Sequence, residues 1–179
     1  LLMHRDDGVR EMGIEILRQN PAAAAEVCPP LIAHENPRIR AAALDAFGID
    51  GQSGSDGAIL ALPLLDDDDA EVRLSSARFL ARVVERTQTT PGNSGTDAIT
   101  AQLRDKIVEA VTPRLGGAGS ARLQSEFLVI LEMLEESTSA SRRRSLLSEL
   151  LEAEEMEEIL AGIQTASRVG AEDSYARIL

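Results

Sequence analysis

Three side chains able to bind a metal recur at one place in a repeated pattern of the sequence. His4 and His34 lie 30 residues apart, and Asp67 takes the equivalent place 33 residues later. Imidazole and carboxylate are common metal ligands, so turns brought together by stacking could form a weak cation site. A metal-binding histidine normally comes with further ligands, and this chain has only two histidines. We therefore expect ordinary turn residues here and no metal.

The acidic run Asp66–Asp69 is a second place where cation chemistry is conceivable. It lacks the glycine and the distal glutamate of a calcium-binding loop, so a solvated turn that caps a helix is the better interpretation. No nucleophile, zinc-protease, phosphate-loop or dinucleotide motif appears. The lone cysteine, Cys28, lies in an apolar run and is expected to be buried. We predict no catalytic residue and no cofactor.

A recurring arginine sets the period of the helices that must carry these residues. Arg10, Arg40, Arg73 and Arg122 lie 30, 33 and 49 residues apart, and the longest gap holds the loop-like segment 87–97. Self-similarity at this period is typical of stacked helical repeats.

Each repeat is expected to hold two helices. Asp6, Asn36 and Asp69, each four residues before the arginine, are predicted to cap the second helix. Apolar residues at helical spacing should give that helix a buried stripe; in the first repeat these are Val9, Met12 and Ile16. The first helices are predicted at 21–33, 55–65 and 97–115, each kinked by a proline near its end.

Further helices are predicted at 119–136, 139–152 and 154–169. The predicted organisation is one domain made of a partial repeat, two repeats, a loop, a third repeat, a degenerate terminal repeat and a tail; these span 1–20, 21–50, 55–86, 87–97, 97–136, 137–169 and 170–179. The opening LLMHRDDGVR aligns with the end of a repeat, so we expect a chain that starts inside one.

The pattern resembles HEAT repeats, which are helical hairpins related to those of phycobilin lyases. The resemblance is carried by PLIAHENPRIRAAALDAF, by PLLDDDDAEVRLSSARFL and, with a Gly-rich turn in place of the acidic one, by PRLGGAGSARLQSEFLVI. It implies an all-α fold, an α-α superhelix built as a solenoid of stacked hairpins. It also implies that the repeated arginine pairs with an acid in the neighbouring turn, with contact to a partner as the alternative.

Composition narrows the class of partner. The net charge of −12 argues against binding to nucleic acid or to an anionic membrane, and it favours a basic or mixed-charge protein. No apolar stretch approaches the length of a membrane span and no signal peptide opens the chain. We expect a cytoplasmic location.

The function that follows is a non-catalytic scaffold or adaptor, because stacked repeats supply extended binding surfaces. An assembly chaperone of HEAT-like type and a lyase-type enzyme subunit remain alternatives. The residues predicted to bind a partner are the exposed positions of the second helices and an arginine cluster that departs from the acidic background: Glu11, Arg38, Asp45, Arg78, Arg82, Arg142, Arg143 and Arg144.

Overall fold

The computed structural model describes residues 1–47, 52–89, 101–116, 120–134 and 156–168. Within these ranges every element is helical, which confirms the all-α class. The chain divides into two compact units, Leu1–Leu103 and Arg104–Leu179, and each is considered by itself.

The described residues of the first unit form five complete α-helices, a short 3₁₀ segment and the start of a sixth helix. The α-helices are α1 (Asp7–Arg18), α2 (Pro21–Ile32), α3 (Pro37–Ala46), α4 (Gln52–Ala61) and α5 (Ala70–Thr89), and the 3₁₀ helix η1 (Leu62–Asp66) joins α4 to the turn before α5. The predicted kink at Pro63 takes the form of this tighter helix. Helix α5 continues through the first three residues of the predicted 87–97 loop, and the rest of that loop lies outside the described residues.

The second helices begin at the residues predicted to cap them. The side chain of Asp6 accepts a hydrogen bond from the Val9 N–H, Asn36 accepts one from Arg38, and Asp69 accepts from Glu71 and Val72. Each cap satisfies backbone donors that the first helical turn leaves without partners.

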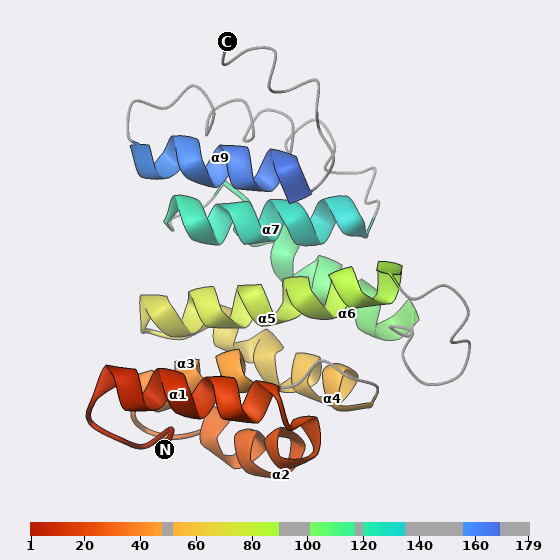
Figure 1. Cartoon of the computed structure of the whole chain (residues 1–179). Helices are drawn as coiled ribbons and strands as arrows, with labels where there is room; N and C mark the ends of the chain where they lie inside the picture. Colours follow the sequence, from red (N-terminus) through yellow and green to blue (C-terminus); the bar gives the residue numbers. More distant parts are fainter. Residues whose placement is uncertain (48–51, 90–100, 117–119, 135–155, 169–179) are drawn as a thin grey trace. The chain divides into compact units, whose positions relative to one another are not determined.

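The helices of this unit pack in two rows. Helix α3 packs between α1 and α5, while α2 contacts α1, α3 and α4, and α4 contacts α5. In Figure 1, α1 and α5 run in the same direction across the molecule, from left to right. Helix α3 buries four alanines (Ala41, Ala42, Ala43 and Ala46), so its backbone can approach both neighbours closely.

An aromatic pair lies at the junction of α3, α4 and α5. The rings of Phe47 and Phe79 stack with centroids 5.5 Å apart and planes 12° apart. Gly57 of α4 lies against both rings: a β-carbon there would be 2.5 Å from Cε1 of Phe47 and 2.6 Å from Cζ of Phe79. Nearby, the buried Ser76 hydroxyl donates to the Ala61 carbonyl at 2.7 Å and ties α5 to α4.

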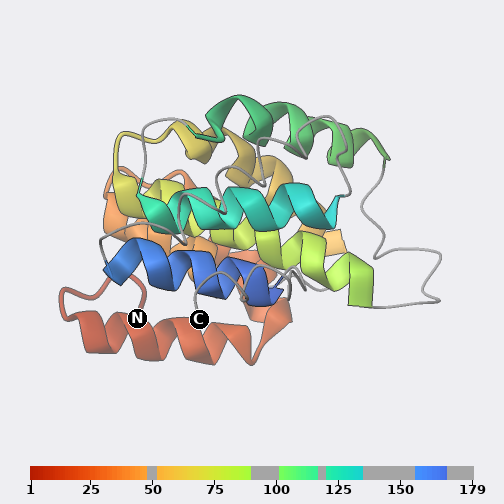
Figure 2. The ribbon, with the colours of Figure 1, turned by 90° about the horizontal axis from the view of Figure 1, so that it is seen from above.

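The second unit contains the end of α6 (Ala101–Val111), the 3₁₀ helix η2 (Thr112–Arg114), α7 (Ala121–Met133) and α9 (Met156–Arg168). Helices α7 and α9 pack side by side and run in the same direction, as both views show (Figures 1 and 2). Buried hydroxyls join them, because Ser125 of α7 is hydrogen-bonded to Thr165 of α9, which donates to the Ala161 carbonyl at 2.8 Å. The helix predicted at 139–152 and the tail from 170 lie outside the described residues.

Candidate functional site

The turns before the three second helices use their potential metal ligands in the same structural way. Nδ1 of His4 accepts the N–H of Asp6 at 3.1 Å, and Nδ1 of His34 accepts the N–H of Asn36 at 3.0 Å. In the third turn, Oδ1 of Asp67 accepts the N–H of Asp69 at 3.0 Å. The three residues that are equivalent in the sequence therefore make the same hydrogen bond, each accepting the N–H two residues further on. In the described part of the chain, no three His, Cys, Asp or Glu side chains gather into a metal site.

The repeated arginines close these same turns. Nη1 of each one donates to the carbonyls six and five residues earlier: Arg10 to His4 and Arg5, Arg40 to His34 and Glu35, and Arg73 to Asp67 and Asp68. Their distances span 2.7–3.0 Å. One residue thus satisfies two loop carbonyls in each of these three repeats, which explains its spacing there.

Arg40 also joins one repeat to the next. Its Nε and Nη2 donate to the two carboxylate oxygens of Asp67 at 2.9 and 2.7 Å, the paired geometry that a guanidinium makes best. The predicted pairing with an acid in the neighbouring turn is confirmed here. Partial burial alone would raise the pKa of Asp67, but the bonds from Arg40 and the Asp69 N–H outweigh it, so this pKa is lowered. Arg10 instead pairs with Asp7 of its own helix, because His34 stands where the next acid would be.

A second cluster gathers at the C-terminal end of α3. Arg18 of α1 donates through Nε to the Asp45 carbonyl at 2.9 Å, and Arg82 of α5 donates to the carbonyls of Leu44 and Asp45 at 2.9 and 3.3 Å. These carbonyls belong to the last turn of α3, where a helix has no internal donors for them and favours positive charge. Arginines from both neighbouring helices therefore cap α3.

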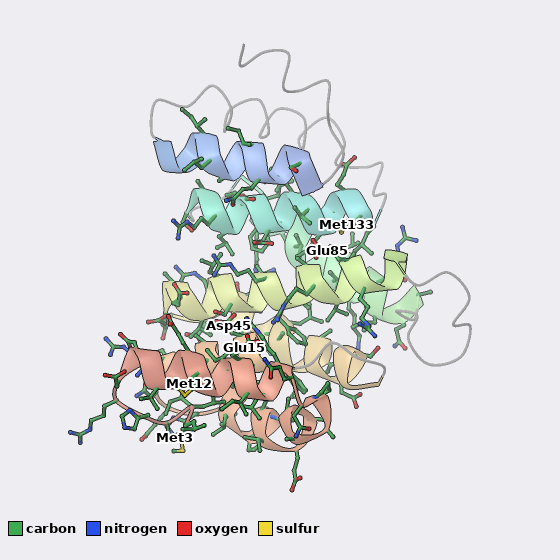
Figure 3. The ribbon with its side chains drawn as sticks, viewed as in Figure 1. Met3, Met12, Glu15, Asp45, Glu85 and Met133 are labelled. Atoms are coloured by element: carbon green, nitrogen blue, oxygen red, sulfur yellow. The ribbon has the colours of Figure 1, made fainter. Side chains whose placement is uncertain are left out.

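The carboxylate of Asp45 accepts fewer hydrogen bonds than the main-chain carbonyls around it. The Ser75 hydroxyl donates to Oδ2 of Asp45 at 3.2 Å. Burial raises the pKa of Asp45, and the charges of Arg82, Arg18 and Arg78 together with the Ser75 bond offset this only in part. Figure 3 shows Asp45 and Glu15 on the side of the unit that faces the reader. The Arg82 guanidinium also lies over the Phe79 ring, 5.6 Å from its centroid.

Cys28 is fully buried in α2, as predicted. Burial raises the pKa of its thiol to about 11, so the side chain stays a neutral thiol at neutral pH.

The predicted partner-binding residues fall into three groups. Glu11 and Arg38 are exposed, as expected. Asp45, Arg78 and Arg82, expected to be exposed, are half-buried, because the cluster at the end of α3 draws them inward. Arg142, Arg143 and Arg144 lie outside the described residues.

Sequence reasoning also misplaced two apolar side chains. Met12 and Ile16 were assigned to the buried stripe of α1, but both are exposed. The residue that α1 does bury is Gly13, one position further round the helix, against Leu1 and Leu2. The equivalent positions in the later repeats carry Ala43 and Ser76. The alignment of the repeats thus shows a small residue at each of these positions, which indicates close packing there.

Comparison with known proteins adds no assignment: no family model, no curated protein and no solved structure matches this chain. None of the helices in the described ranges combines the length and apolar character needed to cross a membrane.

Proposed function

We propose that this protein is a non-catalytic scaffold or adaptor of the HEAT-like type, which binds another protein along the outer face of its second helices. The observation that carries the proposal is the packing of α1, α3 and α5 side by side, with charged residues at equivalent positions. These are Glu15, which is exposed, and Asp45 and Arg78, which are half-buried. A row of this kind offers polar contacts at regular intervals to an elongated partner. In the proposal, the hairpins continue as a solenoid and the protein works in the cytoplasm.

The residues that first suggested chemistry support a binding role because their polar atoms serve the fold. His4 and His34 accept backbone hydrogen bonds, and Arg40 and Arg73 close turns. Chemistry at these atoms would require breaking hydrogen bonds that close the turns before the second helices.

The charge of the chain sets the partner's chemistry. At a net charge of −12, we expect a basic or mixed-charge protein, and binding that weakens as salt screens the contact over about 8–10 Å.

Affinity capture with the whole chain tests the proposal, using the double variant R38E/R78E and the control E26K. Arg38 and Arg78 lie on α3 and α5, whereas Glu26 is an exposed residue of α2. We expect R38E/R78E to lose a protein that the wild type and E26K both retain, with thermal melts confirming that all three fold. Equal capture by all three would contradict a binding site on the second helices.

A further inference from the structure

Helices α2 and α4 are the first helices of consecutive repeats, and they turn equivalent residues toward the core. The alignment that places Pro30 opposite Pro63 shows three positions that are buried in both repeats: Ala24 with Gly57, Cys28 with Ala61, and Ile32 with Leu65 of η1. The two helices therefore present the same side outward.

This outward side carries exposed apolar residues. The exposed fraction is 53% for Ile59, 41% for Val27 and 38% for Leu60. Pro30 and Pro63, three residues after Val27 and Leu60, are exposed as well. We call these five residues the α2–α4 face. A surface helix typically has polar residues on the side opposite its buried stripe, so this face departs from the usual pattern.

Stacking of repeats does not cover the α2–α4 face. Val27 and Leu60 occupy the same position in consecutive first helices, and α2 packs against α4. Val27 stays exposed with the following first helix in place, and Leu60 stays exposed with the preceding one in place. The position therefore points away from both neighbours that a first helix has in a stack.

The repeat does not require apolar residues at these positions. In α6, the first helix of the next repeat, Lys106 and Glu109 take the places of Asp56 and Ile59, and both are exposed. Charged residues are thus compatible with the outward side of a first helix. Exposed apolar residues gathered on one face are typical of an interaction surface.

The charged residues of these helices are all acidic. Helices α2, α4 and η1 contain Glu26, Asp56 and Asp66 but no lysine or arginine. Glu26 and Asp56 are exposed, and Asp56 lies three residues before Ile59, on the same side of α4. This charge favours a basic partner and opposes an anionic membrane surface.

The secondary structure favours a helical partner. The described residues of α2, α4 and η1 are helical, so their backbone groups bond within each helix and offer no strand edge to an extended peptide. An amphipathic helix pairs its own backbone and lays one apolar side against such a surface.

We propose that the α2–α4 face binds a basic amphipathic helix of a partner protein. Aliphatic side chains of that helix cover Val27, Ile59 and Leu60. Lysine or arginine at its edge lies toward Glu26 and Asp56. The inference goes beyond the proposed function, because it adds a second binding surface on the first helices to the one proposed on the second helices.

A second copy of the chain fits this face poorly. Two copies joined through it would bring Glu26 and Asp56 of both to one interface, where α2, α4 and η1 supply no basic residue to offset them. Like charges at such an interface oppose association.

A fluorescein-labelled synthetic peptide of about 14 residues, with leucine on one helical face and lysine on the other, serves as the probe. Anisotropy titrations compare the wild type with I59S/L60S and with the matched control M12S/I16S, which removes two exposed apolar side chains from α1. We expect I59S/L60S to weaken binding by at least about tenfold and M12S/I16S to leave it unchanged. I59K, at a side chain more than half exposed, should weaken binding as much without disturbing the core. Thermal melts confirm that the variants fold.

The electrostatic contact is tested with two variants that change the net charge equally. E26Q/D56N removes two acids beside the α2–α4 face, and E11Q/E15Q removes two exposed acids from α1. We expect E26Q/D56N to weaken binding several-fold and to flatten its salt dependence, and E11Q/E15Q to do neither. Equal effects of the two variants would show attraction to the net charge alone and would remove the contact with Glu26 and Asp56.

Several results would overturn the inference. One is that I59S/L60S and I59K bind the leucine–lysine peptide as tightly as the wild type. Others are equally tight binding of a leucine–glutamate peptide and equal losses in M12S/I16S and I59S/L60S. A concentration-dependent dimer in sedimentation that I59K abolishes would assign the face to a second copy instead.

The two proposals fail separately, because the surfaces lie on different helices. E26K should weaken binding of the leucine–lysine peptide and still retain the protein that R38E/R78E loses. Peptide binding lost in I59K together with equal capture by the wild type, R38E/R78E and E26K would keep the α2–α4 face and remove the site on the second helices. Peptide binding unchanged in I59K together with capture lost in R38E/R78E would do the reverse.

Discussion

Asp67 and Asp45 are both partly buried carboxylates beside arginines, yet their pKa values shift in opposite directions. At Asp67, the guanidinium of Arg40 meets both carboxylate oxygens directly. At Asp45, Arg18 and Arg82 direct their N–H groups to main-chain carbonyls, and the carboxylate keeps one hydroxyl donor. Burial raises the pKa of both carboxyl groups; at Asp67 the direct bonds from Arg40 and the Asp69 N–H outweigh it, whereas at Asp45 the arginine charges and the Ser75 bond offset it only in part.

Breaking the Asp67 site should have the largest effect. Replacement of Arg40 with methionine removes both guanidinium donors from the Asp67 carboxylate, which keeps the Asp69 N–H, and it removes the donor to two turn carbonyls. We therefore expect the free energy of unfolding to fall by about 3 kcal/mol. The same change at Arg10, whose partner Asp7 is largely exposed, should cost about 1 kcal/mol. Urea denaturation measures both, and equal losses would show that the link between repeats contributes nothing beyond the turn contacts.

The next largest difference is expected when each acid is replaced by its neutral amide. Asp67→Asn removes a charge that Arg40 stabilises and should cost about 2 kcal/mol at neutral pH. Asp45→Asn removes a charge that burial penalises and should change stability by less than about 0.5 kcal/mol. The comparison would be wrong if thermal melts showed Asp45→Asn to be the more damaging change.

A third change tests whether a carboxylate alone can build a second Asp67-like site. His34 occupies the place of Asp67 in the preceding turn, and Arg10 stands toward it as Arg40 stands toward Asp67. His34→Asp should therefore raise the free energy of unfolding by about 1 kcal/mol. The gain should vanish in combination with Arg10→Met, and a double-mutant cycle measures this coupling. An additive cycle would mean that Arg10 stays with Asp7.

The smallest effect is the pH dependence. Because the pKa of Asp67 is lowered by folding, its contribution is present above the unfolded value of about 3.9 and is lost as pH falls through the folded pKa. For Asp45 the folded pKa is raised, so its cost appears as pH rises from about 3.9 through the folded pKa. At neutral pH, Asp67→Asn should be less stable than the wild type and Asp45→Asn slightly more stable. Both differences should shrink as the pH falls toward the pKa values of the two carboxyl groups. The free energy of unfolding of each variant and of the wild type, measured between about pH 3 and 7, tests this expectation.

The features predictable from the sequence are those that repeat. Asp6, Asn36 and Asp69 cap helices because these contacts are local and recur with the period. The pairing of Arg40 with Asp67 was implied by the resemblance to HEAT repeats, and Arg10 does not share it.

The cluster around Asp45 could not be predicted, because its members hold no common place in the repeat. Arg18 aligns with Gly48 and Ala81, so no pattern marks it. The exposure of Met12 and Ile16 was missed for a different reason: periodicity identifies an apolar stripe but does not say whether another helix covers it.

Gly57 sets a limit on how this protein can change. With no room for even one methyl group between α4 and the rings of Phe47 and Phe79, every other amino acid there would act as a wedge that forces α4 away from its neighbours. The distance between α4 and its neighbours thus depends on the absence of a side chain, and a larger residue at position 57 would be tolerated only if both phenylalanines became smaller.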